Sequence, residues 1–173
     1  MISKKMEQAL NQQLNRELFS SYLYLSMATY FESKNLIGMS KWMRLQAEEE
    51  HIHSMKLLDF IQKIGGRVIL EQIDKPQIDW DSPLKVFQET LEHEEFITKH
   101  INELTDLAIE ERDHSTRTFL QWYVDEQVEE EAVANEIVQK FNLIGDSKSG
   151  LYMLDQELGA RIPSPNTQTK QNN

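Results

Sequence analysis

The sequence predicts an all-α protein: a four-helix bundle with one long crossover connection and a short fifth helix near its C-terminus. Its 173 residues include only 6 glycines and 4 prolines, and glutamate, glutamine, leucine and lysine fill long unbroken stretches, as helices favour. Apolar residues recur at spacings of three and four through four long segments, which is the period of a helix with one buried face. An aperiodic segment, 66–82, separates the second of these segments from the third.

The helix ends carry recognisable signals. The first helix is expected at about 3–33, and the second follows a break at 35–38 and stops at Gly65 and Gly66. Ser82 as N-cap and Pro83 at the first helical position start the third helix. The chain turns at 112–115, the fourth helix continues to a break at 145–147, and the fifth is expected at 150–158. We predict one domain over 1–160, followed by a polar, proline-containing, disordered tail over 161–173.

The length of segment 66–82 predicts the topology. Roughly 15 residues of extended chain reach about 50 Å, whereas a helix of about 27 residues is about 40 Å long. The segment can therefore run the whole length of the bundle. That would make the second and third helices parallel, as in bundles with a single crossover.

Composition narrows the class of partner. The net charge of -11 argues against nucleic acid and anionic membrane surfaces as partners and favours small cations. The chain has no cysteine, so it forms neither disulfides nor thiolate–metal bonds. The N-terminal residues lack the apolar core of a signal peptide, and no stretch is apolar enough to span a bilayer. We therefore expect a soluble, cytoplasmic protein.

Each long helix places polar side chains in the middle of its apolar stripe. These residues are Glu17 in the first helix, Glu50 and His53 in the second, Glu94 in the third, and Gln127 and Glu130 in the fourth. Mid-helix positions meet at one level of a bundle whichever way each helix runs. Burying unpaired carboxylates costs several kcal/mol each, so such a layer needs cations or a hydrogen-bond network.

A pair of iron ions fits this layer. Four carboxylates carry four negative charges, and two divalent ions neutralise them. Two trivalent ions bridged by one oxide carry the same total charge, which favours iron over zinc. Glu50 and His53 lie three residues apart on one helix face, about 5–6 Å apart at Cβ, so they can share one ion. Ligands rich in oxygen, with one imidazole, suit iron or manganese better than copper.

With these residues the chain resembles the ferritins, and most closely the bacterial non-haem ferritins, over nearly its whole length. Ferritin-like di-iron bundles generally carry Glu-x-x-His on two helices. This chain departs from that pattern, because its second pair is Gln127-x-x-Glu130. The resemblance implies a first iron bound by Glu17, Glu50 and His53. It implies a second iron bound by Glu50, Glu94 and Glu130, with Gln127 nearby and Glu50 bridging.

Further residues match positions of the same family. By this resemblance Glu49, Glu126 and Glu129 form a third iron site, the alternative being an ordinary acidic helix surface. Tyr24 lies two turns beyond Glu17 on the same face and has either a redox or hydrogen-bonding role at the site or a place in the core. Trp122 is interpreted as a packing residue. The other four histidines are expected at the surface or at interfaces: His51, His93, His100 and His114.

The resemblance implies an iron-storage protein with ferroxidase activity. Fe(II) would be oxidised by O₂ or H₂O₂ at the di-iron centre and stored as a ferric mineral inside a twenty-four-subunit homo-oligomeric shell, with the fifth helix near the four-fold axes. Three alternatives remain. A bacterioferritin would bind haem through a Met directly after Glu50, but that residue is His51, so no haem is expected. A Dps-like mini-ferritin would place its iron ligands between subunits. A helical bundle without metal would use the polar layer only for structural specificity.

Overall fold

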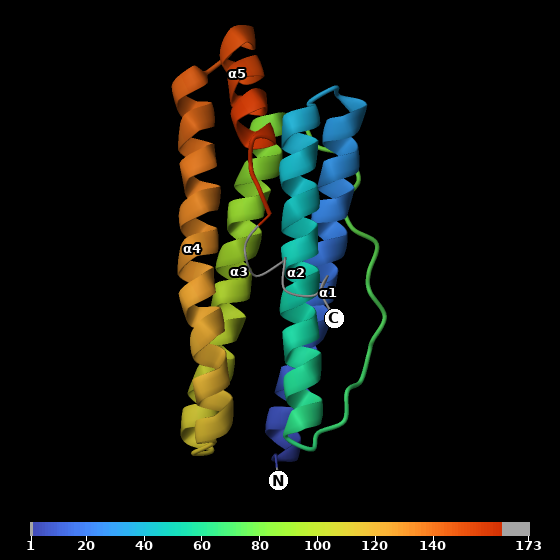
Figure 1. The fold of residues 1–173 in the computed structure, drawn as a ribbon, viewed down its shortest axis with the longest axis vertical. Coiled ribbons are helices and arrows are strands. Elements are labelled where there is room, and N and C mark those ends of the chain that lie inside the picture. Colours follow the sequence, from blue (N-terminus) through green and yellow to red (C-terminus); the bar gives the residue numbers. More distant parts are fainter. Residues whose placement is uncertain (1, 164–173) are drawn as a thin grey trace.

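The computed structural model describes residues 2–163 and confirms an all-α bundle (Figure 1). The helices are α1 (Lys4–Ser33), α2 (Ile37–Lys63), α3 (Pro83–Glu110), α4 (His114–Ile144) and α5 (Lys148–Gly159). The two antiparallel pairs α1/α2 and α3/α4 stand side by side, and α5 packs at one end. None of the helices in the described range is long and apolar enough to cross a membrane. Most of the predicted tail, 164–173, lies outside the described residues.

The segment between α2 and α3 runs along the outside of α1 from one end of the bundle to the other (Figure 1). Two asparagines of α1 hold it there. The Asn11 side chain donates to Arg67 O at 2.9 Å and accepts from Ile69 N at 2.7 Å. Asn15 accepts from Glu71 N at 2.9 Å. As predicted, α2 and α3 therefore run in the same direction.

Most helix starts are capped by a neighbouring side chain. Ser3 accepts from Met6 N, and Ser82 accepts from Lys85 N ahead of α3, whose first residue is the predicted proline. The N-cap residue of α2, Leu36, gives no such bond. Instead, Asp155 Oδ1, which belongs to α5, accepts from Met39 N at 2.9 Å.

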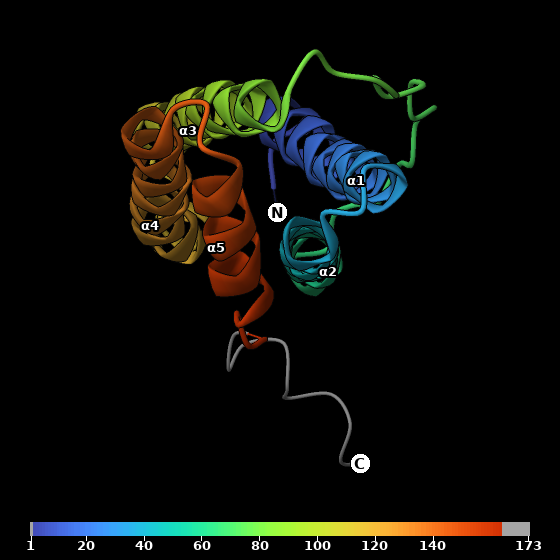
Figure 2. The same cartoon turned by 90° about the horizontal axis from the view of Figure 1, so that it is seen from above.

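The C-terminal helix is docked tightly against the start of α2. A Cβ atom added to Gly38 would lie 1.7 Å from Asp155 O, so the backbones meet where only glycine fits. Lys41 Nζ donates to Gly159 O at 2.8 Å. Seen from above, α5 lies between α4 and α2 (Figure 2). It extends a residue or two beyond the predicted 150–158 at each end.

The apolar pattern of the sequence predicts that the buried stripe of α1 runs from Leu14 through Ser21 and Leu25 to Ala28, but Leu25 is 41% exposed. Ser20 and Tyr24 are buried instead, at 0% each. The stripe advances by three residues after Glu17 rather than four, which a period of 3.6 allows equally well.

The apolar core consists of two separate clusters. One includes Phe31, Trp42, Phe87 and Phe141 and continues into α5, and the other includes Leu10, Leu57, Ile97 and Leu120 at the opposite end. The polar mid-helix residues predicted from the sequence belong to neither cluster. They form a polar layer between the two.

Candidate metal centre

All six predicted residues of the polar layer are buried. Their exposed fractions are 1% for Glu17, 2% for Glu50, 4% for His53, 1% for Glu94, 3% for Gln127 and 9% for Glu130. Each comes from the middle of its helix, where the backbone hydrogen bonds are complete and the side chain alone must find partners. The prediction that four helices converge on one level is confirmed.

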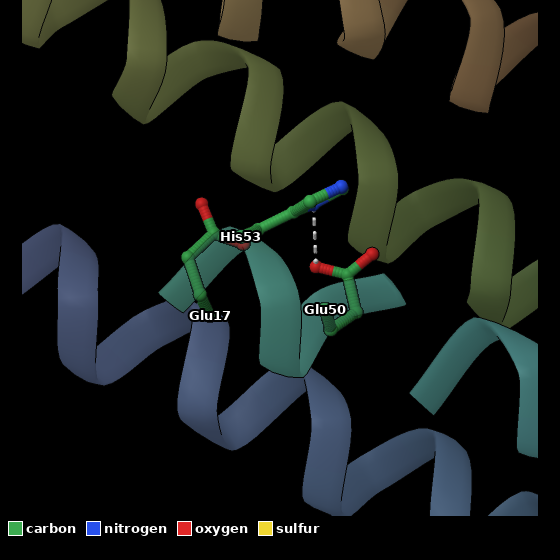
Figure 3. A group of neighbouring side chains, drawn as sticks. All are labelled: Glu17, Glu50 and His53. Atoms are coloured by element: carbon green, nitrogen blue, oxygen red, sulfur yellow. Dashed lines mark ion pairs between the residues drawn. The ribbon is translucent and has the colours of Figure 1, made fainter. Parts of the chain in front are cut away.

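The first group of metal-ligating side chains is Glu17, Glu50 and His53, which each offer one ligand atom within 4.8 Å of the others (Figure 3). His53 Nδ1 lies 3.5 Å from Glu50 Oε2. Gln13 donates to Glu17 Oε1 at 2.7 Å, but Glu17 Oε2 has no hydrogen-bond partner within the described residues. A buried acceptor left open in this way is uncommon and fits a cation ligand. This group is the ligand set expected for the first iron.

A second group consists of His53, Glu126 and Glu130, again with ligand atoms within 4.8 Å of one another. His53 Nε2 lies 3.9 Å from Glu126 Oε1, on the other side of the ring from Glu50. The imidazole therefore stands between two carboxylate groups. Glu126 was predicted to belong to an outer, third site, whereas the structure places it next to the ligands of the inner layer.

Glu94 belongs to neither group. Tyr24 Oη donates to Glu94 Oε1, and Gln127 Nε2 donates to Glu94 Oε2 at 3.1 Å and to the Glu94 carbonyl at 3.3 Å. Tyr24 thus has the hydrogen-bonding position that one of its two predicted roles requires, while also being fully buried. The pair Tyr24 and Gln127 fixes the orientation of the Glu94 carboxylate.

Gln46, one turn before Glu50, is a site residue that the sequence analysis did not single out. Its Nε2 donates to Glu130 Oε2 at 2.7 Å and lies 3.5 Å from Glu50 Oε1. Its position on the core stripe of α2 was the available signal, because a buried amide needs partners as a carboxylate does. Tyr123 also touches the layer, donating from its hydroxyl to the His53 carbonyl at 2.6 Å.

The carboxyl groups of the layer have strongly perturbed acidity. Burial, and then the charge of Glu50, raise the pKa of Glu17 well above its usual value. Burial and the charges of Glu94 and Glu130 do the same to the pKa of Glu50. Burial raises the pKa of Glu94 despite its two donors, and it raises the pKa of Glu130 to about 8. Binding of cations must therefore displace protons from this layer.

The outer acidic residues separate into two kinds. Glu49 is 7% exposed and accepts a hydrogen bond from Arg161 Nη2. Burial raises the pKa of Glu49, and the charge of Arg161 lowers it. Glu129 is exposed and joins no metal-ligating group among the described residues. Of the three predicted third-site residues, Glu126 alone belongs to a metal-ligating group among the described residues, and the third site stays a prediction.

Two aromatic neighbours complete the surroundings. Trp122 meets the His53 ring edge-on, with centroids 5.1 Å apart, and Lys56 Nζ lies 3.0 Å from the Trp122 centroid. His93, which was expected at the surface or at an interface, is half-buried in the single chain. Its Nε2 is 2.8 Å from Ser20 Oγ, and burial lowers its pKa to about 4, so its ring is neutral.

Comparisons with known proteins show which family the chain belongs to. The family model of the ferritin-like domain matches residues 7–144. The bacterial non-heme ferritin of Bacteroides fragilis is 42% identical over 161 residues, covering 93% of this chain and 100% of its own. That of Campylobacter jejuni is 42% identical over 156 residues, covering 90% and 93%. A crystal structure of an open pore ferritin from Archaeoglobus fulgidus superimposes with a TM-score of 0.93 at 53% identity, covering 94% and 99%. The chain belongs to the ferritin family.

Proposed function

We propose that this ferritin stores iron and is itself a ferroxidase. Fe(II) is its substrate, a pair of ions is oxidised by O₂ or H₂O₂ within the polar layer, and the ferric product is deposited as a mineral inside a protein shell. One observation carries the proposal: four buried carboxyl groups and one imidazole share a layer in which a carboxylate oxygen, Glu17 Oε2, has no hydrogen-bond partner among residues 2–163.

The first Fe(II) position is the group Glu17, Glu50 and His53. Two carboxylates and an imidazole supply ligand atoms that already lie within 4.8 Å of one another. Gln13 holds the second oxygen of Glu17, which leaves the open oxygen directed at the ion. The side chains thus need little rearrangement to bind the substrate.

The second position uses Glu50, Glu94 and Glu130, with Gln127 beside them. Each oxygen of Glu94 accepts one hydrogen bond, and a carboxylate oxygen has two lone pairs, so Glu94 can keep Tyr24 and Gln127 and still bind an ion. Glu50 lies close enough to Glu94 and Glu130 for their charges to raise its pKa, which supports its role as the bridge. Glu126 next to Glu130 offers a further carboxylate on the outward side.

A pair of ions matches the oxidant. Each Fe(II) gives one electron and the oxidant takes two, so adjacent ions can supply both electrons in one encounter. The carboxyl groups release their protons when iron binds, and the layer stays close to neutral. Glu49 and Glu126, at the outer edge, form a third and weaker position on the way to the mineral, whereas the exposed Glu129 contributes less directly.

The assembly is a homo-oligomeric shell of twenty-four subunits without haem. The names of the relatives from Bacteroides and Campylobacter support the non-haem assignment, as does His51 in place of a haem-binding Met. All proposed ligands come from one chain, which disfavours a Dps-like arrangement. The absence of cysteine is consistent with the cytoplasm, where we place the protein.

The test is aerobic addition of Fe(II), followed by ferric absorbance and by sizing of the product, with Glu50→Gln compared with Glu48→Gln. Glu48 is an exposed residue of the same helix. Glu50→Gln should lose rapid oxidation, and Glu48→Gln should match the unaltered protein. A chain that binds no Fe(II) under anaerobic conditions would instead be a bundle whose polar layer is structural.

A further inference from the structure

Arg161 lies two residues after the end of α5, at the predicted start of the tail. Its backbone N–H donates to Leu158 O at 3.2 Å, which continues the turn at the end of the helix. Because α5 is fixed through Gly38 and Asp155, the position of Arg161 is set by a docked helix. The ordered domain therefore includes this residue.

The guanidinium of Arg161 reaches the edge of the polar layer on α2. Nη2 donates to Glu49 Oε2, and Nη1 donates to Gln46 Oε1 at 2.9 Å. The guanidinium carbon lies 4.7 Å from the centroid of the Trp42 ring, which supports its flat face. The side chains of Arg161 and Glu49 are 23% and 9% exposed, so this ion pair is largely removed from water.

Two consequences follow from these contacts. The positive charge of Arg161 lies against the Glu49 carboxylate, one of the two carboxylates proposed for the outer iron position. The second hydrogen bond holds the amide oxygen of Gln46 outward and its Nε2 toward Glu130. Arg161 thus contacts the outer position directly and the inner layer through one amide.

We propose that Arg161 is a built-in counter-cation that competes with iron for Glu49, so that a divalent ion binds at the outer position only when the guanidinium leaves. The inference rests on the proposed function. A divalent ion and a guanidinium on one carboxylate repel each other, and the carboxylate satisfies only one of them fully. Arg161 therefore keeps the outer position weak, and iron passes through it without accumulating.

The test is an anaerobic Fe(II) titration by calorimetry of the full-length protein, the variants Arg161→Gln and Glu49→Gln, and their double variant. In Arg161→Gln the inner pair should bind as before, and the weakest class of site should tighten by about 10- to 100-fold, the range for loss of a charged hydrogen-bonded competitor. In the Glu49→Gln background, replacing Arg161 by Gln should leave the Fe(II) affinity of the weakest class of site unchanged. A purely structural role of Arg161 would not show this dependence on Glu49.

Arg161→Lys keeps the charge but cannot hold Glu49 and Gln46 together. The Fe(II) affinity of its outer position should therefore lie between those of the unaltered protein and Arg161→Gln. Lys140→Gln is the matched control, because Lys140 is a cation that pairs with Glu157 of α5 at 2.6 Å and does not contact Glu49. Two results would refute the competition, provided that the inner sites fill normally. In one, Arg161→Gln leaves the Fe(II) affinity of the outer position within twofold of the unaltered protein. In the other, the change at Arg161 tightens Fe(II) binding equally in the Glu49→Gln background. Absence of the inner pair would refute the proposed function instead.

Discussion

Replacement of Glu94 by alanine separates the structural and chemical roles of the polar layer. Glu94 is buried and accepts from Tyr24 Oη and Gln127 Nε2. Removing it leaves the buried Tyr24 hydroxyl without its acceptor, which costs about 1–3 kcal/mol, whereas Gln127 Nε2 keeps the backbone carbonyl of residue 94 at 3.3 Å. The loss of its charge acts in the opposite direction, because that charge raises the pKa of Glu50 and of Glu130.

The two effects predict a modest net loss of stability in the chelator-treated protein. We expect the free energy of unfolding of Glu94→Ala to fall by about 1–3 kcal/mol at neutral pH, or about 3–10 °C in Tm for a domain of this size. Glu94→Gln keeps an acceptor oxygen and the volume, so its stability should stay within about 1 kcal/mol. Both variants lose a ligand of the second iron and should oxidise Fe(II) at least 10- to 100-fold more slowly.

The assay is urea unfolding without metal, combined with stopped-flow oxidation and anaerobic Fe(II) stoichiometry. Glu95→Ala, at the exposed neighbouring position, is the control and should match the unaltered protein in all three. The first iron should still bind to Glu94→Ala through Glu17, Glu50 and His53. Oxidation at the normal rate in Glu94→Ala, or two tightly bound ions, would show that the second iron lies elsewhere.

Three more predictions follow from the same structure. Burial, helped by the charge of Glu94, raises the Glu130 pKa from 4.5 to about 8. Between these two pH values the folded metal-free protein holds a proton that the unfolded chain has lost, so the free energy of unfolding falls as the pH rises. In urea unfolding, Glu130→Gln should show a smaller fall over the same pH range. Anaerobic Fe(II) binding should release protons in a weakly buffered solution, and an absence of proton release would contradict the raised pKa values. Bound Fe(II) should also raise Tm, because an Fe(II) concentration of 100 times Kd adds about 2.7 kcal/mol to the free energy of unfolding. Gly38→Ala should lower stability by about 1–3 kcal/mol in thermal unfolding, because its Cβ would meet Asp155 O, and an unchanged Tm would mean that α5 is not docked as described.

The sequence was sufficient to predict the polar layer because helical periodicity alone decides which side chains point inward. Glu17, Glu50 and Glu94 interrupt otherwise apolar stripes, and their mid-helix positions place them at one level. The length of segment 66–82 likewise decides whether α2 and α3 are parallel. These predictions depend on backbone geometry, which varies little between helices.

Contacts across the chain were not predictable in the same way. The bonds of Arg161 to Gln46 and Glu49 join residues more than 100 positions apart, and they depend on how α5 docks. The sequence also left open whether Tyr24 or Leu25 faces the core, because neighbouring residues differ by only about 100° around the helix, and packing against the other helices decides it. The bonds from Tyr24 and Gln127 to Glu94 change the expected cost of its removal, since repulsion between carboxylates alone predicts no loss of stability.

The cap that Asp155 provides for α2 has a consequence for synthesis of the chain. Met39 and Asp155 are 116 positions apart. At about 5–20 residues per second, the ribosome needs about 6–23 s to make the intervening chain. Throughout that time the first turn of α2 is without the side-chain acceptor that it has in the finished protein. The start of α2, about one turn before Trp42, therefore reaches its final form only after the fifth helix has emerged.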